Sequence, residues 1–187
     1  MAWAEAGGGV TPMLSMESSS DVLDLYRVAK AAAATDDPAR VAAALRLAEG
    51  LRRCGPLVSG AVGFAIHQEA QTRRPDVVAE HPGLRPDADD LIAILHAEAV
   101  TGDQAIAMLT EQPSDGWESW LLDPEREQTV LRAMWVQRLA GPPPEPQAIV
   151  RAFPKEYPQD LPRSLVAEML WTGIGYVVGD LAGQLEP

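Results

Sequence analysis

Histidine and carboxylate pairs are the residues of this sequence that come nearest to the chemistry of an enzyme. His67 is followed two positions later by Glu69, and His96 by Glu98. An imidazole nitrogen and a carboxylate oxygen are both common ligands of zinc. On a helix, however, residues two positions apart point in directions about 200° apart, so one metal ion cannot use both members of a pair. The spacing therefore predicts no metal site, and no cofactor is expected.

The aspartates predict helix caps rather than acid and base catalysis. A glycosidase-like pair needs two carboxyl groups that face each other across a cleft, which adjacent surface residues do not provide. Asp37 and Asp87 each precede an apolar helical pattern, where an aspartate caps the first turn. Motifs for a serine nucleophile, a phosphate-binding loop and a dinucleotide-binding turn do not occur in the sequence. The alternative that remains open is a small helical enzyme or ligand-binding protein with a pocket near His67 and His96.

The single cysteine and two arginines stand where one helix is expected to end. Cys54 has no second cysteine to form a disulfide within the chain, and it is expected to be a small buried side chain. Arg52 and Arg53 are expected to be solvated, because cations are favoured at the C-terminal end of a helix.

Residues 98–127 combine two tryptophans with most of the negative charge of the chain. They hold eight acidic residues and one arginine, a local charge of −7 out of −12. If 116–122 is helical, Trp117 and Trp120 share one face and the acids beside them point away. The two rings then either anchor a short helix to the protein's own core or form a hot spot for a partner. The predicted partner surface consists of the two rings and six acids: Glu111, Asp115, Glu118, Asp123, Glu125 and Glu127.

The net charge narrows the class of partner. With 27 acids against 15 bases the chain carries −12, which repels the phosphates of nucleic acids and favours a basic protein. The sequence therefore predicts, ahead of the enzyme alternative, a non-enzymatic interaction protein. Such a protein would be an adaptor or an inhibitor of the kind that bacterial immunity proteins exemplify.

Segments that target or anchor a protein are not expected in this chain. The first twenty residues lack the basic region and the continuous apolar core of a signal peptide, so a cytoplasmic location is expected. The most apolar run, residues 169–179, is shorter than the roughly 20 residues that cross a bilayer, so a soluble protein without membrane contact is expected. Arginine far outnumbers lysine and alanine is abundant, a bias typical of GC-rich bacterial genomes.

Apolar residues recur at helical spacing along most of the chain, and cap-forming residues stand at the start of many of these stretches. No stretch shows the alternation of a β-strand or an Asn-Gly hairpin turn. The sequence therefore predicts an all-α fold, an irregular bundle of roughly five to seven helices without significant sheet. The expected helices and helical turns are 21–34, 38–53, 56–74, 76–80, one from 87, a short one from Thr101, one or two turns to Leu122, 123–139, 147–152 and 162–182.

Proline and glycine divide the chain into four predicted parts. These are a flexible or loosely packed tail (1–17), a helical core domain (18–140), a Pro-rich linker (141–146) and a C-terminal helical segment packed on the core (147–187). In the last helix Gly173 and the motif Gly175-x-x-x-Gly179 allow the close approach of a neighbour. That neighbour is either part of the same chain or a second subunit, so a homodimer through this helix is an open prediction.

Overall fold

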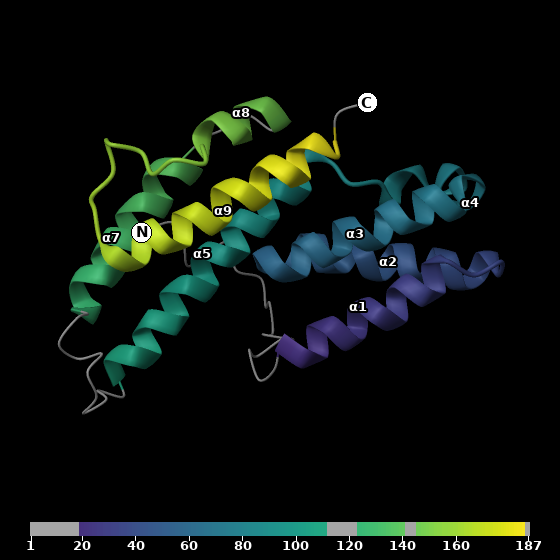
Figure 1. The fold of residues 1–187 in the computed structure, drawn as a ribbon, viewed down its shortest axis with the longest axis horizontal. Helices are drawn as coiled ribbons and strands as arrows, with labels where there is room; N and C mark the ends of the chain where they lie inside the picture. Colours follow the sequence, from purple (N-terminus) through teal and green to yellow (C-terminus); the bar gives the residue numbers. More distant parts are fainter. Residues whose placement is uncertain (1–18, 112–122, 141–144, 186–187) are drawn as a thin grey trace.

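The computed structural model describes residues 19–111, 123–140 and 145–185, which form helices joined by loops. Among these residues are eight α-helices, seven of which have at least seven residues, and no β-strand. The predicted all-α fold is therefore confirmed. The helices cross at varied angles rather than lying in parallel rows, as Figure 1 shows.

The first half of the described chain is a group of helices packed side by side. α1 (Ser19–Ala33), α2 (Pro38–Cys54) and α3 (Leu57–Arg73) follow one another, and α4 (Pro75–Glu80) and the 3₁₀ turn η1 (Pro82–Leu84) close the group (Figure 1). Small and branched apolar side chains form their shared core, called here the N-terminal core. Its buried members are Ala29, Ala33, Val41, Ala44, Leu45, Ala48, Leu51, Ile66, Ala70, Val77 and Val78.

The second half consists of longer helices around larger side chains. α5 (Ala88–Glu111) and α7 (Pro124–Leu139) pack along each other, and α9 (Leu165–Gly183) lies against both, with α8 (Pro146–Ala152) beside it (Figure 1). We call their shared interior the C-terminal core. Its buried members include the aromatic residues Phe64, Trp135, Phe153 and Trp171 and the aliphatic residues Leu91, Ile94, Leu95, Leu131, Met134, Ile149, Ile174 and Val178.

α3 belongs to both cores. Leu57 and Phe64 lie in the C-terminal core, whereas Ile66 and Ala70 lie in the N-terminal core. Gly60 lets α3 approach α5 closely, because a Cβ atom added at this glycine would clash with the side chain of Ile94. The two halves are therefore held together by the packing of α3 in both cores, in addition to the connection along the chain.

Local cap signals located most helix starts correctly. Asp37 begins α2 as predicted, and its carboxylate accepts a hydrogen bond from the backbone N–H of Ala39 at 3.0 Å. The Asp87 carboxylate likewise accepts a hydrogen bond from the backbone N–H of Asp90 at 3.0 Å, at the start of α5. An aspartate at this position satisfies one of the free N–H groups of the first helical turn.

Two predicted boundaries are wrong. Thr101 does not begin a helix, because α5 continues through it to Glu111 and its hydroxyl donates to the Ala97 carbonyl at 2.9 Å. Inside a helix a threonine hydroxyl can donate to the carbonyl four residues earlier, so Thr101 fits the interior of α5 as well as a cap position. The last helix begins at Leu165 rather than 162, because Ser164 caps it by accepting a hydrogen bond from the backbone N–H of Ala167 at 3.1 Å.

Trp171 holds the segment between α8 and α9 against α9 through hydrogen bonds and ring stacking. Its indole N–H donates to the carbonyl oxygens of Pro154 at 2.8 Å and of Glu156 at 3.1 Å. Its ring stacks on Phe153, with ring centroids 5.4 Å apart. Gly175 permits this approach, because a Cβ atom there would lie 2.6 Å from the Pro154 carbonyl oxygen. The close neighbour predicted for the glycines of the last helix is therefore, at Gly175, a segment of the same chain.

Among the described residues, α9 is also long and apolar enough to cross a membrane, by length and composition alone. Its 19 residues exceed the apolar run at 169–179 on which the expectation of no membrane contact rested. A core helix of a soluble protein can have the same composition, and Trp171, Ile174 and Val178 of α9 are at most 1% exposed. The absence of membrane contact stays a prediction.

The four predicted parts of the chain also stay predictions. The tail (1–17), most of the linker (141–146) and the turns expected up to Leu122 lie outside the described residues. Within the described residues, α9 packs on α5 and α7.

Candidate functional site

The predicted partner surface falls partly outside the described residues. Trp117, Trp120, Asp115 and Glu118 lie between two described ranges, and of Glu111 the structure describes its backbone as the last residue of α5. The structure therefore tests neither of the two interpretations of the tryptophans.

The three remaining acids of that surface lie at the start of α7. The Asp123 carboxylate accepts a hydrogen bond from the backbone N–H of Arg126 at 3.2 Å and so caps the helix. Glu125 is exposed. The prediction that Glu127 belongs to the partner surface is wrong, because its side chain is buried. Glu127 is 7% exposed and accepts a hydrogen bond from the backbone N–H of Val166, in the first turn of α9, at 3.3 Å. A carboxylate at this end stabilises α9 and is not available to a partner.

Two other acids between residues 98 and 127 also serve the fold. Glu98 of α5 accepts a hydrogen bond from the backbone N–H of Leu57 at 2.8 Å and so caps α3. Asp103 accepts two hydrogen bonds from Arg132, at 2.6 and 2.9 Å. These bonds hold the pKa of the Asp103 carboxyl below its usual range. The local charge of −7 therefore overstates the charge that this segment offers to a partner.

His67 and His96 lie on different helices, α3 and α5. Among the described residues, no three histidine, cysteine, aspartate or glutamate side chains come together as potential metal ligands. Burial lowers the pKa of His67 to about 4, assisted by the positive charges of Arg52 and Arg85. Burial also lowers the pKa of His96. Both imidazoles are therefore neutral at pH 7, and the absence of a bound metal stays a prediction.

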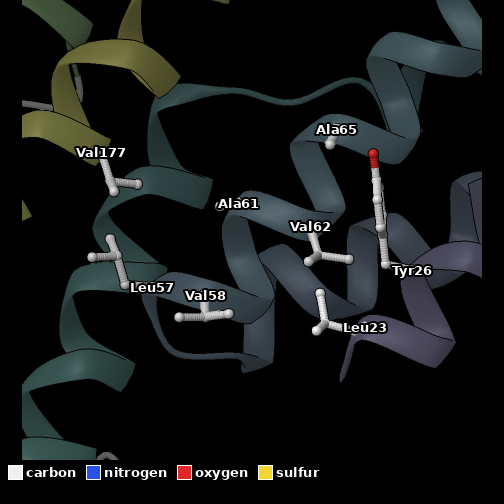
Figure 2. A pocket seen from close by; sticks show the side chains of 8 residues that line it. All are labelled: Leu23, Tyr26, Leu57, Val58, Ala61, Val62, Ala65 and Val177. Carbon is white, nitrogen blue, oxygen red and sulfur yellow. The ribbon is translucent and has the colours of Figure 1, made fainter. Parts of the chain in front are cut away.

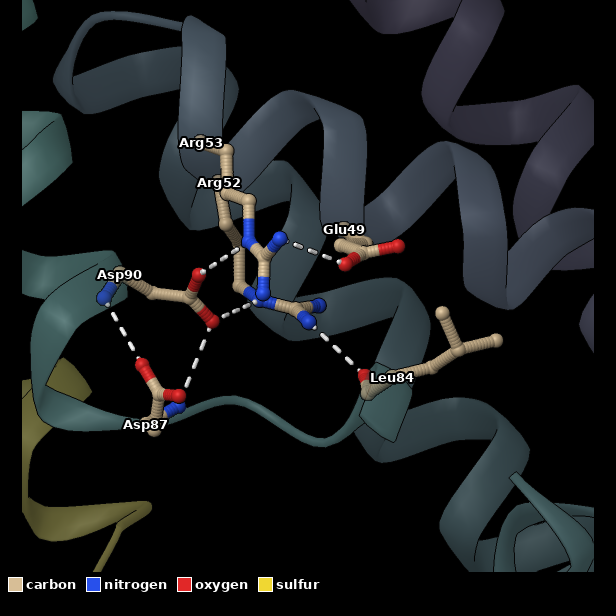
Figure 3. Close-up of polar contacts among 6 residues, drawn as sticks. All are labelled: Glu49, Arg52, Arg53, Leu84, Asp87 and Asp90. Atoms are coloured by element: carbon tan, nitrogen blue, oxygen red, sulfur yellow. Dashed lines mark hydrogen bonds and ion pairs between the residues drawn. The ribbon is translucent and has the colours of Figure 1, made fainter. Parts of the chain in front are cut away.

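A buried ion pair that was not predicted from the sequence joins α2 to α5. Arg52 is fully buried, and its Nε donates to the Asp90 carboxylate at 2.7 Å, as Figure 3 shows. Its Nη2 donates to the Leu84 carbonyl at 2.8 Å. The Asp90 carboxylate also accepts a hydrogen bond from the backbone N–H of Asp87 at 3.3 Å. The expectation that Arg52 is solvated is therefore wrong, whereas Arg53 has an exposed side chain.

The apolar spacing of α2 contained a signal that Arg52 is buried. Position 52 follows Ala48 by one turn and Leu45 by two, and both of these residues are buried. A charge on a buried helix face needs a partner of opposite sign. Because this arginine is held by two acceptors, its role is to fix α2, η1 and α5 together rather than to reach a substrate.

Cys54 is exposed, contrary to the expectation of a buried side chain. It is the last residue of α2, two positions after the last buried residue of that helix. Residues two positions apart on a helix point to nearly opposite sides, so Cys54 faces away from the core that receives Arg52.

An open apolar groove runs between α1 and α3, with α9 at one end, and has a volume of about 350 Å³ (Figure 2). Its side chains are hydrocarbon except for the hydroxyl of one tyrosine. Leu23 is 52% exposed and Val58 is 67% exposed. The groove is lined by Leu23, Tyr26, Leu57, Val58, Ala61, Val62, Ala65 and Val177.

Acidic residues without a cationic partner lie near the α9 end of this groove. On α1, Asp24 pairs with Arg27 at 3.0 Å and Lys30 pairs with Glu69 of α3 at 3.7 Å, so these charges cancel. Asp180, which follows Val177 by three residues on α9, is exposed and forms no ion pair with the described residues. Glu98 contacts the groove residue Leu57 through its carboxylate. Asp180 and Glu98 therefore carry negative charge that no ion pair with the described residues compensates, whereas Lys155 lies over the ring of the α9 residue Tyr176, 5.0 Å from its centroid.

The lining of the groove limits what it can do chemically. Apart from the Tyr26 hydroxyl, the lining side chains are hydrocarbon, which bind apolar groups and supply no acid, base, nucleophile or metal ligand. Comparison of the chain with protein-family models, with curated proteins and with solved structures found no match.

Proposed function

We propose that this protein acts by binding another protein, as an adaptor or an inhibitor, and that it is not an enzyme. The observation that carries the proposal is the open apolar groove between α1 and α3. Leu23 and Val58 are about half or more exposed in the isolated chain, so covering them would stabilise a complex. A contiguous apolar hollow on a protein surface is typical of an interaction site.

An amphipathic helix of the partner is the occupant that fits this groove. Helical partners lay one apolar stripe into a groove between helices and keep their polar side in water. The net charge of −12 and the unpaired Asp180 near the groove favour a helix with basic residues beside its stripe. Charges at the rim of an interface mainly accelerate association, whereas the apolar contacts slow dissociation.

The acidic tryptophan segment is the second contact region in this proposal. Trp117 and Trp120 are of the type that dominates the binding energy of interfaces. Asp123 and Glu125 are exposed close to them in the sequence and supply negative charge. A basic partner would meet the groove with its helix and this segment with its other basic residues.

A synthetic amphipathic helix of leucine and lysine serves as the probe for the groove, with fluorescence anisotropy of the labelled peptide as the measurement. We expect this peptide to bind the full chain, and a peptide with glutamate in place of lysine not to bind. Val58→Gln should weaken binding about tenfold, because roughly 1.5 kcal/mol of apolar burial is lost.

Val28→Gln is the matched control, because Val28 is 69% exposed on α1 but does not line the groove. A peptide of the same composition in scrambled order keeps the charge and loses the apolar stripe. Equal weakening by Val58→Gln and Val28→Gln, or equal binding of the scrambled peptide, would show that charge alone attracts the probe. The groove would then not be the binding site.

A further inference from the structure

Two buried nitrogen atoms at the junction of α2, α3 and α5 have no hydrogen-bond partner among the described residues. They are Nη1 of Arg52 and Nε2 of His67. The other two guanidinium nitrogens of Arg52 donate to Asp90 and to the Leu84 carbonyl, so Nη1 alone lacks an acceptor (Figure 3). Buried polar groups in folded proteins are almost always paired, with the protein or with ordered water, so these two atoms point to a bound molecule.

α3 turns His67 toward the side chain of Arg52. Gly63 brings the two helices together there, since a Cβ atom added at Gly63 would lie 2.8 Å from Cγ of Arg52. The ring centroid of Phe64 lies 5.7 Å from the guanidinium carbon. His67 follows these two residues by four and three positions, and residues at these spacings share one face of a helix. The imidazole therefore lies one turn beyond the part of α3 that contacts Arg52.

The first turn of α5 reaches the same place. Near its start α3 lies beside Glu98 of α5, and further along Gly60 lies against Ile94. The two helices are therefore antiparallel, and continuing this register brings His67 to the first turn of α5. Asp90, which binds the guanidinium, belongs to that turn. The two unpartnered nitrogens consequently belong to one polar cluster.

The surroundings of the imidazole keep it neutral. Arg52 from α2, Arg85 from the chain after η1 and Asp90 from α5 are the charged groups that act on it. Burial, assisted by the two arginines and opposed by Asp90, lowers the pKa of His67 to about 4. A neutral imidazole has one ring nitrogen that donates and one that accepts. An accepting Nε2 is the favourable form here, because its lone pair then faces the positive guanidinium.

We infer that one internal water molecule lies between Arg52 and His67, accepting a hydrogen bond from Nη1 and donating one to Nε2. Water can do both at once, and buried waters typically serve polar groups that lack other partners. The ion pair with Asp90 already balances the charge of Arg52, which favours a neutral molecule over an anion. His67 is then a positioning residue for the guanidinium. The site is separate from the apolar groove and does not rest on the proposed function.

The water bridge depends on the protonation of His67. An imidazolium donates from both ring nitrogens and accepts at neither, so Nε2 could no longer receive a proton of the water. The bridge is therefore complete at pH 7 and is lost as the pH falls through the lowered pKa of His67. Arg52 would keep Asp90 and the Leu84 carbonyl but lose its link to α3.

Nuclear magnetic resonance of the full chain, labelled with ¹⁵N, tests the bridge at the two side chains. At pH 7 we expect the ring proton of His67 on Nδ1, with Nε2 unprotonated, and slow exchange of the Arg52 guanidinium protons with solvent. His67→Leu removes the acceptor and should speed that exchange at least about tenfold, because a hydrogen bond of a charged group is lost. His67→Gln keeps an acceptor and should stay within about threefold of the parent.

Two comparisons separate the bridge from a general effect on the fold. Gln68→Leu makes the same kind of change at the next, exposed position of α3 and should leave the exchange at Arg52 as it is in the parent. On acidification past the pKa of His67, exchange at Arg52 should become faster in the parent than in His67→Gln, whose side chain does not titrate. This second comparison uses no variant that lacks the acceptor, so it holds even if His67→Leu fails to fold.

A crystal structure at pH 7 should show a water within about 3.2 Å of both Nη1 and Nε2. The inference is overturned if that position holds no water, or holds an anion instead. A proton found on Nε2 at pH 7 would also contradict it, as would a folded His67→Leu chain in which Arg52 exchanges at the rate of the parent.

Discussion

The side chain of Arg52 connects three elements that are separate in the chain: α2, the turn η1 and the start of α5. Burying a guanidinium removes it from water at a large cost, which the Asp90 carboxylate and the Leu84 carbonyl offset. Its third contact is the ring of Phe64, whose centroid lies 5.7 Å from the guanidinium carbon. The position of this one side chain therefore fixes how the first half of the molecule meets α5.

Removing either partner of this ion pair should destabilise the fold strongly. Arg52→Met and Asp90→Asn should each lower the free energy of unfolding by about 3–5 kcal/mol, because the remaining group stays buried without its partner. Urea denaturation measures this. Arg53→Met removes a longer contact, 3.7 Å, to the same carboxylate from a side chain that is 58% exposed, and should change it by less than about 1 kcal/mol. A loss as small in Arg52→Met as in Arg53→Met would mean that position 52 is solvated.

His67 should make the stability depend on pH between about 6.5 and 4. Its pKa is lowered to about 4 in the fold, by burial first and then by Arg52 and Arg85, with Asp90 opposing. Since the unfolded chain binds the proton more tightly, stability is complete above pH 6.5 and is lost as the pH falls toward 4. His67 Nε2 has no hydrogen-bond partner, so a proton there would have no acceptor.

The comparison with His67→Gln isolates this effect from the titration of carboxylates. Between pH 6.5 and 4 the parent should lose about 1–2 kcal/mol more than the variant, a figure reduced from the full shift because the imidazole is partly solvated. Urea denaturation at several pH values gives the difference. Parallel curves for the two proteins would show that His67 titrates normally.

Residues that act locally were predictable, whereas residues that act across the fold were not. The caps at Asp37 and Asp87 follow from neighbours within three positions, which the sequence displays directly. Arg52 and Glu127 act on groups more than thirty positions away, Asp90 and Val166. Near a helix end a buried and a solvated charge have the same local sequence, so the tertiary partner decides between them.

At the scale of the element, α9 offers two glycines that should respond oppositely to alanine. Gly175→Ala should destabilise by about 1–3 kcal/mol, because the new methyl group must displace the backbone at Pro154. Gly173→Ala should stabilise by about 0.5–1 kcal/mol, because the site is open and alanine favours the helix. Thermal unfolding of the two variants gives the signs. The same sign for both would contradict the close contact at Gly175.

The segment between α5 and α7 carries a prediction about binding kinetics with the partner protein. Glu118→Lys combined with Glu125→Lys should slow association with a basic partner, because the attraction that steers the encounter is reversed. Trp117→Ala or Trp120→Ala should speed dissociation and cost about 2 kcal/mol or more if that ring is a hot spot. Surface plasmon resonance separates the two rates. Loss of helical structure in the tryptophan variants would instead favour the interpretation of the rings as core anchors.

Helices with a regular apolar stripe could be predicted from the sequence, but the positions of their ends could not always be predicted. α2 and α7 begin and end within one or two residues of their predicted limits, because an aspartate and a proline mark each start. α5 was divided at Thr101 although its 24 residues form one helix. The groove could not be predicted, because exposure depends on which helices pack against each other.

At the scale of the whole molecule, α3 makes the two cores depend on each other. Ile66 is in the N-terminal core and Ile174 is in the C-terminal core, and both are fully buried. Ile66→Ala and Ile174→Ala should each destabilise by about 2–5 kcal/mol. Because α3 contributes to both cores, each variant should still unfold in a single transition. Circular dichroism and fluorescence from the buried Trp135 and Trp171 should give coincident curves, whereas separate midpoints would show that the halves unfold independently.

The exposed thiol of Cys54 gives this protein a natural attachment point for a chemical label. The sequence contains one cysteine, so a maleimide dye would react at one defined position without any substitution. The position lies four residues before the groove residue Val58 in the sequence. An environment-sensitive dye there would change its emission when a peptide enters the groove.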